Sequence, residues 1–177
     1  MHYALQVYSL DPVFSQDLPA SFTNHDPKLI NRIIQSTLLV KKKFVEIDEF
    51  DTGFRKALNL GHSFGHAIES ASSFNIPHGI AVIIGCSLAY HLSINLGFLA
   101  KGTIAEHLKL IDCVVCEAIN FFEKVPVNLN LFSSALASDK KNPSPSEALL
   151  ILPGIDIDGS FKMSQVIRPV DDVVNFV

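Results

Sequence analysis

Residues 55–69 read RKALNLGHSFGHAIE, and after a short gap residues 77–79 read PHG. His62 and His66 are four residues apart, so in a helix both imidazoles leave the same face. His78 falls in the turn that follows this predicted helix, and a tight turn can bring it back toward that face. Three neutral imidazoles that converge on one point suit zinc or another borderline transition metal.

Spacing alone leaves other interpretations of this stretch open. A pair of histidines four residues apart is about as often two ordinary surface or core residues. Gly61 and Gly65 are also four residues apart. Glycine weakens a helix, so this pair is costly unless something must approach the helix backbone closely. Glu69, three residues after His66, is either a partner that orients an imidazole or a solvated charge on the helix face.

Elsewhere the periodicity predicts a mostly helical chain. Asp26 and Pro27 are typical of an N-cap and a first helical position, and Thr103 and Glu106 have the spacing of a capping box. Near the end, two apolar runs flank a turn with glycine and aspartate, which predicts a β-hairpin. The expected helices span roughly residues 27–45, 60–72, 80–96, 103–122, 134–137 and 170–177, and the expected strands residues 148–152 and 161–167.

The pattern excludes a dinucleotide-binding domain within this sequence. There is no internal repeat, no glycine-rich GxGxxG motif after a strand, and no alternation of strands with helices. We therefore predict a mainly α fold over residues 1–177 as one domain, with a small β-hairpin at about 148–167. A parallel sheet with interleaved helices would contradict this prediction.

Composition narrows the function classes. The net charge of -4 and the pI near 5.9 argue against a nucleic-acid partner. Three cysteines give no disulfide framework and suit a reducing, cytoplasmic location, and no secretory signal is expected. The apolar stretch 80–96 contains polar residues and is interpreted as a buried helix, not a membrane span. The mean hydropathy of +0.30 indicates either a large core or an apolar surface covered by a partner.

The stretch 55–69, together with residues 77–79 and 81–82, resembles the metal-site signature of 3-dehydroquinate synthase and related sugar-phosphate cyclases. Weaker similarity runs from the helix that carries Lys41 to residues 139–142 and the strand after them. The resemblance implies the helical C-terminal domain of the dehydroquinate synthase-like and iron alcohol dehydrogenase-like architecture. The N-terminal Rossmann-like domain that binds NAD is expected to be absent from this chain.

The resemblance also implies roles. His62 and His78 would bind Zn²⁺ or Co²⁺, which polarises a hydroxyl and its neighbouring carbonyl. His66 would lie near the substrate phosphate and assist proton transfer. A phosphorylated sugar acid needs cations and polar groups around it, and NAD, bound outside this chain, would carry the hydride. The residues implied to contact this substrate are Lys41, Arg55, Asn59 and one of Lys140 and Lys141.

Two features depart from the family pattern. The third metal ligand of the family, a glutamate, is expected just before Met1, and the neighbouring family lysine falls near His2. Ile80 stands where the family usually has glutamate after the His-Gly pair, which removes a charge beside the metal site. The expected protein is thus a fragment, one half of a split enzyme or a truncated reading frame, and inactive as a lone chain.

The leading hypothesis is a sugar-phosphate cyclase that eliminates phosphate and closes a carbocycle by an intramolecular aldol step, as the resemblance implies. The alternatives are the C-terminal domain of an iron-dependent alcohol or glycerol dehydrogenase and a non-catalytic remnant. Arg55, Asn59 and the lysines at 140–141 favour the cyclase, because a simple alcohol needs no cationic cluster. The expected partners are the sugar-acid substrate and either a second copy or a separate NAD-binding chain.

Overall fold

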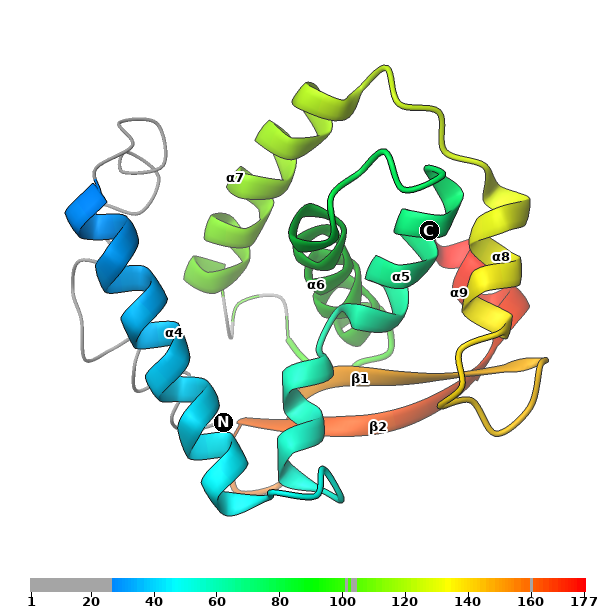
Figure 1. Cartoon of the computed structure of the whole chain (residues 1–177). Coiled ribbons are helices and arrows are strands. Elements are labelled where there is room, and N and C mark those ends of the chain that lie inside the picture. Colours follow the sequence, from blue (N-terminus) through cyan, green and yellow to red (C-terminus); the bar gives the residue numbers. More distant parts are fainter. Residues whose placement is uncertain (1–26, 101, 103–104, 160) are drawn as a thin grey trace. The chain divides into compact units, whose positions relative to one another are not determined.

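The computed structural model describes residues 27–100, 102, 105–159 and 161–177, and Figure 1 labels their helices and strands. The chain divides into two compact units, unit 1 up to Leu58 and unit 2 from Asn59 to Val177. The predicted N-cap at Asp26 and the capping-box residue Thr103 lie outside the described residues.

Unit 1 contains helix α4 (Pro27–Ile47) and most of a 3₁₀ helix, η1 (Phe54–Asn59). Phe44, at 2% exposure, stacks on Phe54 with ring centroids 4.7 Å apart. Between the two helices, the carboxylate of Asp48 accepts backbone N–H groups from Thr52 at 2.9 Å, Gly53 at 2.8 Å and Arg55 at 3.0 Å. This carboxylate therefore fixes the loop that leads into η1, an element that the sequence did not predict.

The hydrogen bonds to Asp48 make this loop sensitive to acid. The backbone N–H groups of Arg55, Thr52 and Gly53 lower the pKa of Asp48 from 3.8 to about 2. A carboxyl with a depressed pKa in the folded state stabilises it fully above pH 3.8 and loses that contribution as the pH falls toward 2. We expect Asp48→Asn to be less stable than the parent chain at pH 6, with the difference shrinking between pH 4 and 2.5 in urea titrations. A difference that is constant over this range would contradict the prediction.

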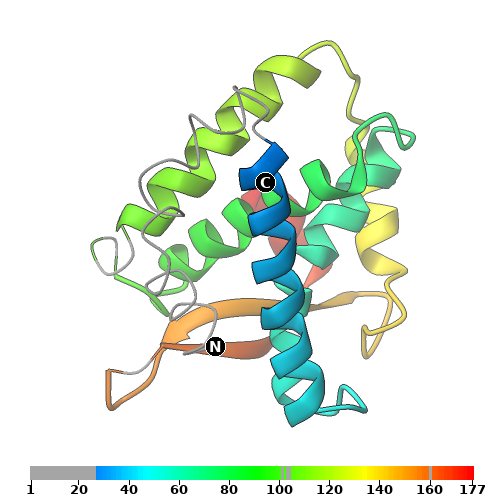
Figure 2. The same ribbon diagram turned by 60° about the vertical axis from the view of Figure 1, so that its left-hand side comes forward.

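Unit 2 is built from helices packed beside one antiparallel hairpin (Figures 1 and 2). The strands β1 (Glu147–Ile155) and β2 (Phe161–Pro169) pair over their whole lengths, with Ile151 opposite Gln165. No other strand occurs in the described residues, so the mainly α fold with a hairpin is confirmed. The helices are α5 (His62–Ala71), α6 (His78–Asn95), α7 (Ala105–Phe122), α8 (Leu129–Ala137) and α9 (Val170–Phe176).

Helix α6 is at the centre of unit 2 and packs against α5, α7 and β1. Its length and mean hydropathy of 1.2 would also suit a membrane span, a test that core helices of soluble proteins pass as well. The core beside it is closed by side chains of at most 1% exposure from α5, α8, β1 and α9: Phe64, Phe132, Leu136, Leu150, Leu152 and Val173. This packing supports the interpretation of residues 80–96 as a core helix.

The glycines of the signature stretch are explained by the contact between α5 and α6. A Cβ on Gly65 would lie 3.0 Å from Val82 Cγ2 and 3.1 Å from Val82 Cα, and one on Gly61 would lie 2.5 Å from the backbone nitrogen of Cys86. Gly61 also has a φ of 75°, which side chains disfavour. The close approach that the glycine spacing predicts is therefore made by a neighbouring helix.

Candidate metal and anion site

The three histidines of the signature stretch meet in unit 2. Their ring centroids form a nearly equilateral triangle, with 5.8 Å between His62 and His66 and 5.7 Å from each of these to His78. His62 and His66 leave one face of α5 as predicted. His78 was predicted in the turn and is instead the first residue of α6, because Pro77, with an extended backbone at the N-cap, ends the turn one residue earlier.

Two of these imidazoles have their Nδ1 atoms occupied. His62 Nδ1 lies 3.2 Å from the backbone carbonyl oxygen of Leu60, and His78 Nδ1 lies 2.9 Å from Glu69 Oε2. A neutral imidazole that donates from Nδ1 has its lone pair on Nε2, the usual arrangement in metal-binding histidines. The donor chemistry therefore fits a borderline transition metal such as Zn²⁺ or Co²⁺.

Electrostatics favour the neutral form of His62. Burial holds the pKa of its imidazole below the ordinary value of 6.5, and the charges of His66, His78 and Lys141 lower it further, against the hydrogen bond to Leu60, which raises it. A neutral imidazole is the form that binds metals. The lowered pKa therefore favours the metal-binding, neutral form of His62 at neutral pH.

A second grouping of donors overlaps with the first. The potential ligand atoms of His66, Glu69 and His78 all lie within 4.8 Å of one another, whereas His62 joins the cluster through its ring contacts. The assignment of His62 and His78 as ligands and His66 as a substrate contact stays a prediction.

Of the two predicted lysines, Lys141 contacts another predicted site residue. Its Nζ donates to Asn59 Oδ1 at 3.2 Å, and its charge acts on His62. Its backbone N–H donates to Asp139 Oδ1 at 3.0 Å. Lys140 is exposed, and no hydrogen bond or ion pair is found for it among the described residues.

Asn142 anchors the lysine segment to its surroundings. Its Nδ2 donates to the carbonyl oxygens of Leu136 at 2.8 Å and Ala137 at 3.2 Å, and its Oδ1 accepts the N–H of Leu149 at 2.9 Å. These bonds join the end of α8 to β1, so Lys141 is held between two fixed elements. In the sequence motif at residues 139–142, Asn142 thus has a structural role, which is to link α8 to β1.

The other two predicted residues belong to unit 1. Lys41 is exposed on α4, and Arg55 lies in η1, where its Nη1 donates to the carbonyl oxygen of Glu49 at 2.8 Å. Their approach to the histidines stays a prediction. The structure also adds one group that no side-chain pattern signals, the carbonyl oxygen of Leu60 beside His62.

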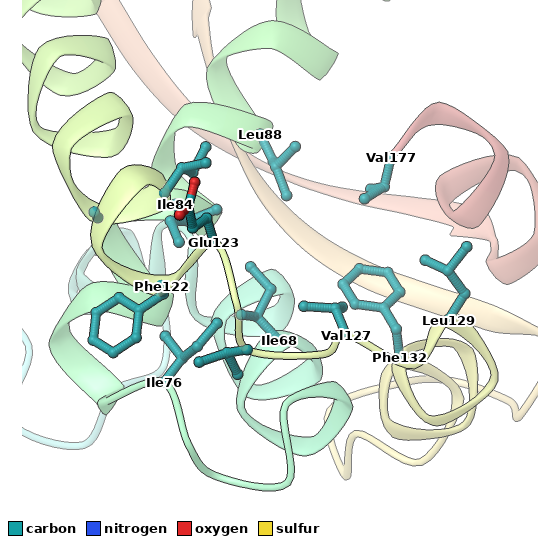
Figure 3. A pocket seen from close by; sticks show the side chains of 13 residues that line it. Ile68, Ile76, Ile84, Leu88, Phe122, Glu123, Val127, Leu129, Phe132 and Val177 are labelled. Atoms are coloured by element: carbon teal, nitrogen blue, oxygen red, sulfur yellow. The ribbon is translucent and has the colours of Figure 1, made fainter.

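An apolar cavity of about 320 Å³ lies elsewhere in unit 2. Ile68, Ile84, Phe122 and Phe132 are among its lining residues, and Glu123 is the charged one (Figure 3). None of the predicted site residues lines this cavity. It therefore lacks the cations that a phosphorylated substrate requires.

The fold and the cluster define a helical domain that brings together histidine and glutamate side chains able to hold a metal ion. The sequence pattern described as 3-dehydroquinate synthase C-terminal matches residues 9–142. The chain belongs to the family of 3-dehydroquinate synthase C-terminal domains, so the predicted family is confirmed.

Curated relatives agree with this family. A 3-dehydroquinate synthase of Saccharolobus solfataricus is 34% identical over 154 residues, which cover 86% of this chain and 42% of the relative. One of Methylococcus capsulatus is 33% identical over 146 residues, 80% of this chain and 40% of the relative. One of Dehalococcoides mccartyi is 43% identical over 88 residues, 50% of this chain and 24% of the relative. The chain thus spans less than half the length of these relatives.

Proposed function

We propose that this chain supplies the metal- and substrate-binding region of a 3-dehydroquinate synthase-like sugar-phosphate cyclase. The observation that carries the proposal is the triangle of His62, His66 and His78 with Lys141 and Asn59 beside it. A metal-ligand set and a fixed ammonium group at one place suit a substrate that carries both hydroxyl and phosphate groups.

In this proposal His62 and His78 hold Zn²⁺ or Co²⁺ through Nε2. When bound, the metal supplies a Lewis acid for a substrate hydroxyl and its neighbouring carbonyl. His66, exposed and 5.7 Å from the His78 ring, remains available to exchange a proton with the substrate. Nothing in this assignment requires His66 as a ligand.

Lys141 and Asn59 provide polar side chains for substrate binding in this proposal. The ammonium group of Lys141 is an anion-binding group, and its contact with Asn59 Oδ1 directs it toward the histidine side. Lys41, Arg55 and Lys140 remain further candidates for contacts with phosphate or carboxylate groups. This cationic set supports the cyclase over an alcohol dehydrogenase, whose simple substrate carries no phosphate.

We further propose that NAD is held outside residues 1–177 and supplies the hydride chemistry. The partner that holds NAD would be a separate NAD-binding chain or region, whereas a second copy of this chain would be a partner that covers apolar surface. Large apolar side chains that stay exposed support a covering partner, among them Phe121 at 81% and Leu129 at 60%. The free thiols of Cys86 and Cys116 fit a cytoplasmic location.

The proposed function is tested with a chimaera between this chain and a relative. The matching C-terminal region of the Saccharolobus solfataricus synthase is replaced by this chain, and phosphate release from a phosphorylated heptulosonate is followed with NAD and Co²⁺ present. We expect turnover that falls by at least ~100-fold in the Lys141→Ala form, because a hydrogen bond from a charged group to an anionic group of the substrate is worth up to ~3 kcal/mol. A folded chimaera that oxidises simple alcohols but releases no phosphate would support the alcohol dehydrogenase instead.

A further inference from the structure

Glu69 and His78 meet across the turn between α5 and α6. The side chain of Glu69 is 15% exposed and that of His78 is 56% exposed, and Oε2 of the first lies 2.9 Å from Nδ1 of the second. They are nine residues apart in sequence. The contact therefore depends on the path of the turn and not on helical spacing.

The turn is held by several local hydrogen bonds. Ser72, at 1% exposure, donates through Oγ to the carbonyl oxygen of Glu69 at 3.0 Å and accepts the N–H of Ile76 at 3.3 Å. The N–H of Phe74 donates to the same Glu69 carbonyl at 2.7 Å. Phe74 has a φ of 61°, a conformation that such residues rarely adopt. These bonds hold the backbone between Glu69 and Ile76, and so the path by which the chain returns to His78.

We propose that Glu69 is a positioning residue that keeps His78 in the tautomer protonated at Nδ1, so that Nε2 faces a metal. The carboxylate accepts the Nδ1–H bond and fixes the ring angle. The carbonyl oxygen of Leu60 does the same for His62. This inference rests on the proposed metal site but concerns a residue that carries no ligand atom in it.

The geometry argues that Oε2 of Glu69 and Nδ1 of His78 do not share a metal ion. Two donor atoms on one tetrahedral zinc lie about 3.3 Å apart, given metal–ligand bonds of about 2.0–2.1 Å. The 2.9 Å between Oε2 and Nδ1 is shorter and is an ordinary length for a charge-assisted hydrogen bond. With Nδ1 occupied by the carboxylate, His78 has Nε2 left for the ion.

The first test is nitrogen NMR of the metal-free, full 177-residue chain at mildly alkaline pH, where imidazoles are neutral. We expect His78 to be protonated at Nδ1 in the parent chain. In Glu69→Ala, and to a smaller degree in Glu69→Gln, protonation should move to Nε2. Glu117→Gln, which removes a charge at an exposed position of α7, should leave the tautomer unchanged. Protonation of His78 at Nε2 in the parent chain would overturn the proposal.

The second test is Co²⁺ titration followed by the visible absorption of the metal. Glu69→Gln should weaken Co²⁺ binding by about 10- to 100-fold, the usual effect of losing a partner of a ligand. The same change in a His78→Ala chain should have no further effect, because Glu69 acts through His78. A full effect in the His78→Ala background would overturn the positioning role and identify Glu69 as a ligand.

The two tests separate this inference from the proposed function. If Co²⁺ binds the parent chain nowhere near the histidines, the proposed metal site is wrong and so is the role of Glu69 toward a metal. The tautomer of His78 would then still show whether the carboxylate fixes the ring. If Co²⁺ binds through His62 and His78 and its affinity is unchanged by Glu69→Gln, the proposed metal site is supported and the positioning role of Glu69 is wrong.

Discussion

Replacing His62 or His78 by alanine is expected to weaken Co²⁺ binding by about 100-fold or more. Loss of an outer partner of a ligand alone lowers metal affinity about 10–100-fold, and loss of the ligand itself removes a whole metal–nitrogen bond. The rings of His62 and His78 lie 5.7 Å apart with Nδ1 of each occupied. We therefore expect the two substitutions to lower the Co²⁺ affinity by similar factors. Titration with Co²⁺, followed calorimetrically and by absorption, measures the effect.

The matched control is His91→Ala. His91 is also on a helix of unit 2, is exposed, and lies 3.5 Å from Asp112 through its Nε2, away from the histidine triangle. Its loss should change Co²⁺ affinity by less than about twofold, within the usual effect of a surface substitution. If His62→Ala and His78→Ala also fall within this range, the histidines have a structural role and the proposed metal site is wrong.

Gly85→Ala should be the most destabilising single methyl addition in unit 2. The new Cβ would collide with the carbonyl oxygen of Gly61 and would lie 2.9 Å from the backbone nitrogen of Gly65. Neither obstacle is a flexible side chain, so α5 and α6 must move apart. Overpacking of a tight core costs about 1–3 kcal/mol and occasionally more, and we expect the upper end of that range. The midpoint of urea unfolding, read by circular dichroism, provides the measurement.

Gly79→Ala serves as the comparison. Gly79 belongs to the same helix, and a Cβ placed there meets nothing within 4 Å. Alanine in an open helical position is favoured over glycine by about 0.5–1 kcal/mol. The two substitutions should thus shift the unfolding midpoint in opposite directions. A Gly85→Ala chain as stable as the parent would show that α5 and α6 do not approach as closely as described.

The sequence predicted the elements of unit 2 better than their boundaries. The hairpin was expected at residues 148–167 and is observed from Glu147 to Pro169, because two apolar runs flank a turn with glycine and aspartate there. Helix α8 was expected near residues 134–137 and begins at Leu129. Asn128 caps it by accepting the N–H groups of Asn130 and Leu131, a signal present in the sequence but not used.

The candidate site was predictable where it depends on helical spacing. His62 and His66 follow from one turn of helix, and their convergence with His78 is observed. The pairing of Glu69 with His78 was left open, since nine residues and a left-handed turn separate them. The structure distinguishes Lys141 from Lys140 by the contact of Lys141 with Asn59, and which of the two lysines meets the substrate stays a prediction.

The carbonyl oxygen of Leu60 receives two groups from different helices. His62 Nδ1 approaches it at 3.2 Å from α5, and Cys86 Sγ donates to it at 3.5 Å from α6. Burial raises the pKa of this thiol to about 11, so it stays a neutral donor. Substitutions that repack α5 against α6, for instance to raise thermal stability, would therefore also change how firmly the His62 ring is held in its orientation. An interior substitution at Cys86 thus acts on the chemistry of a histidine at the domain surface.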